Sequence, residues 1–145
     1  MVESASFSPS KVIQSLFDVS KVLTDIPIEP LAAALFEWTI LFKQLGKALS
    51  IAFSDITEKV AIIRKHSNDY NSKIKGVMSL VQLERSLNLH MLNGENNKSF
   101  KDSTNYASGA RTTLRLMWFM DFLHHMMEAM IQGKEVFRQI FNFFL

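Results

Sequence analysis

The chain has 145 residues, of which 48% are hydrophobic and 21% are charged, and this composition fits one globular domain with a sizeable core. Its formal net charge of +2 is too small to indicate nucleic-acid binding, which usually requires a clustered basic face. The absence of cysteine excludes disulfide bonds and thiolate metal sites.

The beginning of the chain gives no sign of secretion. Its first residues, MVESASFSPSK, are polar and acidic, whereas a secretory signal is basic and then apolar. No uncharged apolar run approaches the roughly 20 residues that a membrane-spanning helix needs. We therefore expect a single domain over residues 1–145, located in the cytosol.

Helices are predicted along the chain, because apolar residues recur at intervals of three and four while glycine and proline are scarce. Ser8 and Pro9 are typical of a helix start, with an N-cap residue followed by proline at the first helical position. The prolines of residues 25–30 (DIPIEP) end this first helix.

A long helical stretch is predicted from Leu31 to about His66, and Gly46 either kinks it or splits it in two. Its apolar stripe consists of residues spaced by threes and fours. These are Leu35, Trp38, Phe42, Leu45, Leu49, Phe53, Ile56, Val60 and Ile63.

Two further helices are predicted, from about 73 to 92 and from about 110 to 132, with Gly133 as the residue just beyond the last one. A polar loop over 93–109 separates them. The candidate core positions of the earlier of these helices are Ile74, Val77, Val81 and Leu87. The sequence thus predicts an all-α fold whose apolar helix faces pack on one another.

Four charged residues lie within otherwise apolar helical segments. Asp55 and Lys59 are four residues apart, and so are Arg111 and Arg115. On a helix, side chains at this spacing lie one above the other on a single face. A desolvated charge is costly unless it meets a partner, so one acid and three bases beside apolar stripes indicate either a site for an anion or a buried network of ion pairs.

Residue types alone leave these alternatives open. Guanidinium groups such as those of Arg111 and Arg115 suit phosphate or carboxylate, and their mutual repulsion favours an anionic partner. The ordinary alternative is that the charges face water or pair with acids elsewhere, since most charged side chains are exposed. Asp55 likewise either bridges to Lys59, or orients it and accepts a hydrogen bond from a ligand amide.

A second polar cluster, on the last predicted helix, is a candidate metal site. Its Asp121-x-x-His124 spacing resembles half of the ligand set of a di-metal helical bundle, and His125 and Glu128 lie nearby. Such a bundle also needs a second acid-x-x-His helix and two further glutamates, and no second pair is present. Surface histidines are the favoured interpretation, so we expect no metal, no cofactor and no catalysis. A metal-dependent helical enzyme is the least supported alternative.

Three stretches together resemble the glycolipid transfer protein superfamily in order and spacing. They are FEWTILFKQLGKALSIAFSDITEKVAIIRK (36–65), SLVQLERSLN (79–88) and GARTTLRLMWFMDFLHHMMEAM (109–130). The similarity covers roughly residues 11–130. It implies a two-layer helical sandwich that takes up lipid chains between its layers and carries lipids between membranes.

Within that superfamily the chain is similar to the branch that binds ceramide-1-phosphate. By this resemblance Asp55 accepts the amide hydrogen bond of a sphingolipid, while Lys59, Arg111 and Arg115 hold its phosphate. Members that bind sugar headgroups have asparagine in place of Lys59 and a stacking tryptophan in place of Arg115. The implied partners are a sphingolipid and, briefly, a membrane surface.

The chain departs from the family at its end. Family members continue for several more helices, one of which carries a histidine that shares the amide contact, and neither His124 nor His125 matches that residue. The tail KEVFRQIFNFFL (134–145) does not resemble any later part of the family. We therefore expect a domain that lacks its C-terminal part, with weakened transfer and with self-association through exposed apolar residues. The alternative function is a helical interaction module that binds an amphipathic partner helix.

Overall fold

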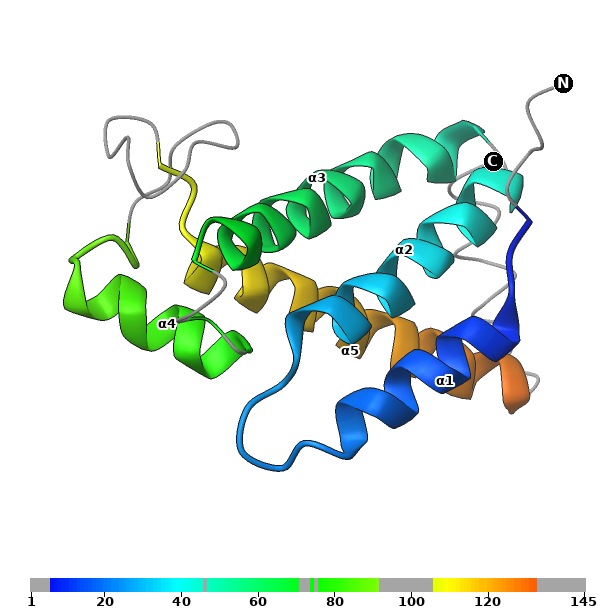
Figure 1. Ribbon diagram of the computed structural model, residues 1–145. Coiled ribbons are helices and arrows are strands. Elements are labelled where there is room, and N and C mark those ends of the chain that lie inside the picture. The colour runs from blue at the N-terminus through cyan, green and yellow to red at the C-terminus, as the bar shows by residue number, and fades with distance from the viewer. Residues whose placement is uncertain (1–5, 46, 71–73, 75, 92–105, 133–145) are drawn as a thin grey trace, which may run out of the picture.

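The computed structural model describes residues 6–45, 47–70, 74, 76–91 and 106–132, which form five α-helices (Figure 1). These are α1 (Pro9–Ser20), α2 (Ile28–Leu45), α3 (Lys47–Asp69), α4 (Val77–Ser86) and α5 (Gly109–Ile131). The all-α fold predicted from the sequence is confirmed. None of the helices in these described ranges combines the length and apolar character needed to cross a membrane.

The helices are arranged as a sandwich. Helices α1, α2 and α3 lie side by side, with α2 packed against both of the others. Helix α5 crosses behind them and packs against α3, and α4 packs against α5 (Figure 1). Helices α3 and α5 run in opposite directions along the chain, which matters for how their charged residues meet.

Two prolines define the start of α2. Pro27 precedes the helix and Pro30 lies in its first turn, so α2 begins at Ile28, three residues before the predicted start at Leu31. Proline is tolerated in a first turn because the backbone N–H groups there have no partner within the helix. The residues predicted only to end the first helix thus also begin the second.

The long predicted stretch is two helices. Helix α2 ends at Leu45 and α3 begins at Lys47. Of the two alternatives, the stretch is therefore split into two helices and not merely kinked. Gly46 itself lies outside the described residues. So do Gly133, which was predicted to follow the last helix, the tail over 134–145 and most of the polar loop.

The core is centred on a set of stacked rings from three helices. Phe42 of α2 and Phe53 of α3 stack with ring centroids 3.8 Å apart, and Phe119 of α5 meets Phe53 edge-on at 5.2 Å. Aromatic pairs in such geometries contribute about 0.5–1.5 kcal/mol beyond the burial of their area. The described members of the predicted stripe, Leu35, Phe42, Phe53, Ile56, Val60 and Ile63, are buried, and Trp38 packs against them half-buried.

Helix α4 is shorter than predicted, and two of its predicted core residues were wrong. Val81 is only half-buried, and Leu87 is 47% exposed because the helix already ends at Ser86. The buried face instead contains Val77, Leu80 and Glu84, which are spaced by three and four. The other two predicted core residues, Ile74 and Val77, are buried.

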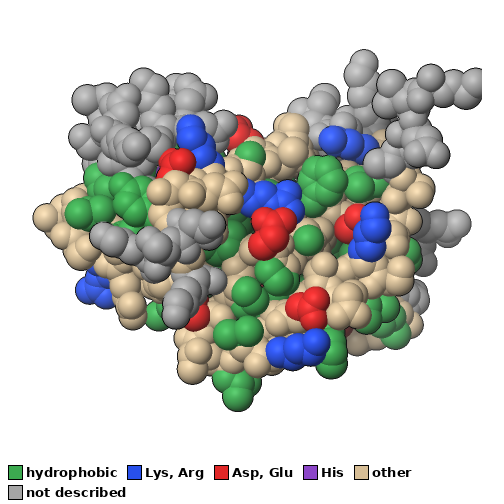
Figure 2. All heavy atoms as spheres, viewed as in Figure 1, with side chains coloured by type: hydrophobic (Ala, Val, Ile, Leu, Met, Phe, Trp, Pro, Cys, Tyr) green, Lys and Arg blue, Asp and Glu red, His purple; other side chains and the backbone are tan. Residues whose placement is uncertain are grey.

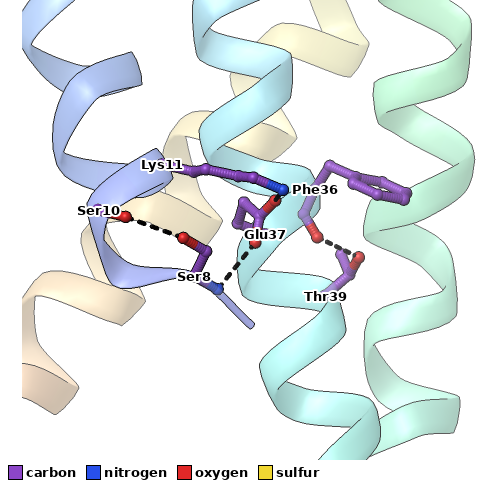
Figure 3. A network of polar contacts seen from close by, with 6 residues as sticks. All are labelled: Ser8, Ser10, Lys11, Phe36, Glu37 and Thr39. Atoms are coloured by element: carbon purple, nitrogen blue, oxygen red, sulfur yellow. Dashed lines mark hydrogen bonds and ion pairs between the residues drawn. The ribbon is translucent and has the colours of Figure 1, made fainter. Parts of the chain in front are cut away.

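A buried carboxylate attaches α1 to α2. Glu37 accepts a hydrogen bond from the backbone N–H of Ser8 at 3.1 Å and pairs with Lys11 Nζ at 3.4 Å (Figure 3). Ser8 precedes Pro9 at the predicted start of α1, but its hydroxyl contacts Ser10 and does not cap the helix. The contacts in Figure 3 therefore fix the first turn of α1 through Glu37.

The face shown in Figure 2 carries no extended region of one charge. Acidic and basic side chains lie next to one another on it, with hydrophobic side chains between them. This agrees with the near balance of 16 basic and 14 acidic residues. Long-range steering of a polyanion is not a property of this face.

We expect Phe42→Ala to lower the free energy of unfolding by about 3–5 kcal/mol, because the substitution leaves a cavity among the stacked rings. Urea denaturation followed by circular dichroism measures this loss. The matched control is Phe17→Ala, since Phe17 is 57% exposed and Lys21 Nζ lies over its ring at 4.4 Å from the centroid. Its loss should stay below about 1 kcal/mol. Equal losses for the two variants would contradict the assignment of the core.

Candidate functional site

One predicted pair forms a direct contact on α3. Lys59 Nζ donates to the carboxylate of Asp55, four residues earlier on the same face. The two side chains differ sharply in their surroundings, because that of Lys59 is 8% exposed and that of Asp55 is 58% exposed. A buried ammonium group is thus held by a carboxylate that remains accessible to solvent.

The other predicted pair lies on α5. Arg111 is half-buried in the first turn of the helix, and Arg115 is exposed one turn later. Within the described part of the chain, neither guanidinium group forms an ion pair or a hydrogen bond. The alternative in which these arginines bridge to acids of the bundle therefore has no support among the described residues.

The packing of α3 against α5 sets the two pairs at the same level. Phe53 meets Phe119, and thirteen residues later His66 contacts the carbonyl of Ala107 at 2.7 Å. The helices run in opposite directions (Figure 1). Lys59 lies between these two contacts along α3, and Arg111 and Arg115 lie between them along α5, so the two pairs belong to the same stretch of the contact between the helices. No hydrogen bond or ion pair among the described residues joins one pair to the other.

The position of Arg111 depends on a carboxylate that the sequence analysis missed. Glu84 of α4 is fully buried and accepts hydrogen bonds from the Tyr106 hydroxyl, the Ser108 hydroxyl and the backbone N–H groups of Gly109 and Ala110, at 2.5–3.0 Å. An anion is favoured at a helix N-terminus because the N–H groups and the helix dipole point towards it. In this protein Glu84 fills that place, so an external anion must be held by side chains further along α5.

The close approach of α4 explains the glycine at the start of α5. A Cβ atom at Gly109 would lie 2.6 Å from Leu80 Cδ2 and 3.1 Å from Glu84 Oε1. A larger residue would therefore push α5 away from Glu84. One signal in the sequence points to Glu84, which is that it continues the apolar spacing of Val77 and Leu80.

His66 is a second buried polar residue to which the sequence assigned no role. Its ring stacks on that of Tyr106 with centroids 4.9 Å apart, and its Nε2 lies 2.7 Å from the carbonyl of Ala107. Burial lowers the pKa of His66 below its usual value of 6.5, opposed by the contact with the Ala107 carbonyl. Burial and then the hydrogen bond to Glu84 raise the pKa of Tyr106, which keeps this hydroxyl a donor.

A surface pocket of about 360 Å³ is lined by residues of α2 and α3. Its lining consists of Lys43, Ser54, Thr57, Glu58 and Ala61. None of the four predicted headgroup residues takes part in it. The apolar cavity predicted between the helix layers is therefore a different space, and it stays a prediction.

Comparison with known proteins identifies the family. Residues 26–142 match the model of the family described as Glycolipid transfer protein (GLTP). Because the match spans more than half of the chain, the chain belongs to the glycolipid transfer protein family, which binds and transfers lipids of the glycolipid and sphingolipid class. No curated protein and no solved structure matches it.

The family match confirms the resemblance to the superfamily that was inferred from the sequence, but it covers a different range of residues. The predicted similarity ran over roughly 11–130, whereas the match runs over 26–142 and includes most of the tail that was expected to have no counterpart. The missing C-terminal part and the ceramide-1-phosphate branch both stay predictions.

We expect Glu84→Gln to destabilise the protein by about 2–4 kcal/mol, because an amide nitrogen would face donors that now bind a carboxylate oxygen. Chemical denaturation of the two proteins side by side measures the difference. Glu58→Gln, which changes an exposed glutamate of α3 in the same way, should leave stability within about 0.5 kcal/mol. A Glu84→Gln protein as stable as the parent would refute the role given to this carboxylate.

The lowered pKa of His66 predicts acid sensitivity. Below its usual value of 6.5 the unfolded chain binds a proton that the folded protein does not, so the free energy of unfolding should fall as pH falls through this region. Denaturation at pH 7.5, 6.5 and 5.5 measures the slope. His66→Gln retains a donor for Ala107 but cannot be protonated, so its slope should be flatter. An unchanged slope would show that other groups cause the pH dependence.

Proposed function

We propose that the protein binds a sphingolipid with a phosphate headgroup, ceramide-1-phosphate in particular, and transfers it between membranes without catalysing a reaction. Lys59, Arg111 and Arg115 hold the phosphate, and Asp55 accepts the hydrogen bond of the lipid amide. The observation that carries this proposal is that both arginines lack an acidic partner within the described residues. It is supported by the buried Lys59, which lies on the neighbouring α3 along the same stretch of its contact with α5.

The charge balance of these four residues favours an anion. Three cationic groups and one carboxylate leave an excess of two positive charges, which matches a phosphate monoester at neutral pH. Charge-assisted hydrogen bonds contribute about 1.5–3 kcal/mol each, so three donors are enough to select a phosphate over a neutral headgroup.

The Asp55–Lys59 ion pair supplies a route from the empty to the occupied site. A phosphate that binds Lys59 replaces Asp55 as its partner. The carboxylate of Asp55, which already faces solvent, is then available to accept the amide N–H of the same lipid. One exchange of partners thus gives both headgroup contacts and leaves each of the two side chains with a hydrogen-bond partner.

The same face of α5 suits the amphipathic shape of such a lipid. Arg111, Arg115, Trp118 and Phe122 are spaced by four, three and four, so two basic groups are followed along one face by two aromatic rings. Both rings are substantially exposed, and Trp118 is 64% exposed. Each methylene left in water costs about 0.8 kcal/mol, so apolar surface next to the headgroup residues is needed for the chains.

The remaining parts of the proposal follow from transfer between membranes. The chain acts as one domain in the cytosol, contacts membrane surfaces only briefly, and uses no metal or cofactor for this activity. Exposed apolar side chains on α5 also favour self-association of the free protein.

A second candidate function is a helical interaction module that binds an amphipathic partner helix. The observation in its favour is the number of large apolar side chains exposed on α5, namely Leu114, Met117, Trp118, Phe122, Met127 and Ile131. Native mass spectrometry of protein purified from cells separates the two functions. A mass increase of one lipid supports transfer, whereas a bound polypeptide and no lipid supports the module.

Transfer between vesicles provides the direct test. We expect the protein to move fluorescent ceramide-1-phosphate faster than a neutral glycolipid with the same acyl chain, because only the phosphate engages the three basic groups. Arg115→Ala should reduce the rate for ceramide-1-phosphate by roughly tenfold, the equivalent of one lost charge-assisted hydrogen bond. The rate for the neutral lipid should hardly change.

The matched control is Arg85→Ala, which removes an exposed arginine of α4 outside the proposed site and should leave both rates unaltered. Equal rates for the two lipids would refute the proposed headgroup site. An Arg115→Ala protein whose preference for the phosphate lipid is unchanged would refute the role of Arg115.

A further inference from the structure

We propose that His124, His125 and Glu128 bind one divalent transition-metal ion, with Zn²⁺ as the ion of matching chemistry. The three residues lie on an exposed part of α5 and take no part in the lipid site proposed above. This metal site is therefore independent of whether the protein transfers lipids.

The first observation is the spacing of the donor atoms. His124 Nε2 lies 3.8 Å from Glu128 Oε1, and His125 Nδ1 lies 3.5 Å from Glu128 Oε2. One ligand atom from each residue falls within 4.8 Å of the others. Ligands about 2.0–2.1 Å from a tetrahedral Zn²⁺ are separated by roughly 3.4 Å. The separations are longer than those of hydrogen bonds and near the spacing that a shared ion imposes.

The second observation is a carboxylate that orients one of the histidines. Asp121 Oδ1 lies 3.6 Å from Nε2 of His125, on the other side of the ring from Nδ1. Histidine ligands of metals usually donate their second ring N–H to a carboxylate, which fixes the tautomer and the ring. In this arrangement a carboxylate lies near each ring nitrogen of His125, so Asp121 is placed to accept the Nε2 proton and orient the ring when Nδ1 binds an ion.

The helix itself brings these ligands together. Glu128 follows His124 by four residues and His125 by three, and both spacings place side chains on one face. Asp121 precedes His125 by four. The local backbone therefore sets the geometry, and the site needs no contribution from another helix.

The ligand set determines which ions fit. Two neutral imidazoles and one carboxylate suit Zn²⁺, Cu²⁺ or Ni²⁺, whereas Mg²⁺ and Ca²⁺ prefer all-oxygen sites. Three protein ligands leave the fourth tetrahedral position to water. This site differs in two ways from the di-metal site considered from the sequence. A mononuclear site requires ligands from only one helix. In addition, Asp121 lies next to His125 and not next to His124.

The test is isothermal titration calorimetry, in which the full chain is titrated with zinc chloride at pH 7.5. We expect one equivalent to bind. His125→Gln and Glu128→Gln should each raise the dissociation constant roughly tenfold or more, and Asp121→Asn by roughly tenfold through the lost orientation of His125. The double variant His124→Gln/His125→Gln should bind no zinc, and magnesium chloride should give no heat of binding.

Glu58→Gln is the matched control, since it changes an exposed glutamate on α3 and should bind zinc as the parent does. The ligands are exposed, so circular dichroism should show unchanged helix content. If a histidine variant loses helix content, the nearly isosteric variant Glu128→Gln tests whether this cluster binds zinc. The proposal is refuted by the absence of zinc binding at millimolar concentration, by equal binding to the double variant, or by magnesium binding with similar affinity. His125→Gln should leave lipid transfer unchanged, which separates this result from a failure of the lipid proposal.

Discussion

The buried carboxylate of Glu84 fixes the start of α5 against α4, and the position of the charged residues on α5 depends on this interaction. A fully buried charge is tolerated only when its oxygens are satisfied, and Glu84 meets this condition with four donors from the start of α5 and the residues before it. Since the donors include two backbone N–H groups, the bonds fix the helix itself and not only its side chains. His66 holds the same segment from the other side, through the carbonyl of Ala107.

This anchoring has a consequence for charge. With its N-terminal N–H groups already bound to Glu84, α5 offers an incoming anion only its side, where Arg111 and Arg115 lie. The buried Lys59 lies at the same level on α3 but is neutralised by Asp55. The two arginines therefore remain the local surplus of positive charge, and an anion that binds Lys59 competes with Asp55 for it.

The sequence predicted most of the helices because their apolar residues recur with a helical period over many turns. The stripe that contains Phe42, Phe53 and Ile63 was assigned correctly for this reason. In α4 the prediction missed Leu80 and Glu84. The spacing of Val77, Leu80 and Glu84 is the local signal for Glu84, but its four hydrogen-bond donors come from residues 22 to 26 positions later in the chain. Of the site, the spacing within each charged pair was predictable. The level at which the pairs face each other depends on distant contacts such as Phe53 with Phe119.

Helix α5 shows how one amphipathic element can serve separate purposes. Its residues Leu116, Phe119 and Leu123 are buried in the core, while Arg111 and Arg115 lie along one flank and His124 and Glu128 lie on the exposed side. An α-helix has 3.6 residues per turn, so the buried set faces a different side of α5 from the charged residues. The buried face of α5 packs against the protein through apolar contacts. Substitutions on the exposed side do not touch these contacts, so they can alter ion binding without moving the arginines. Independent substitution on each face is therefore possible, and the two proposed sites can be examined separately in the same protein.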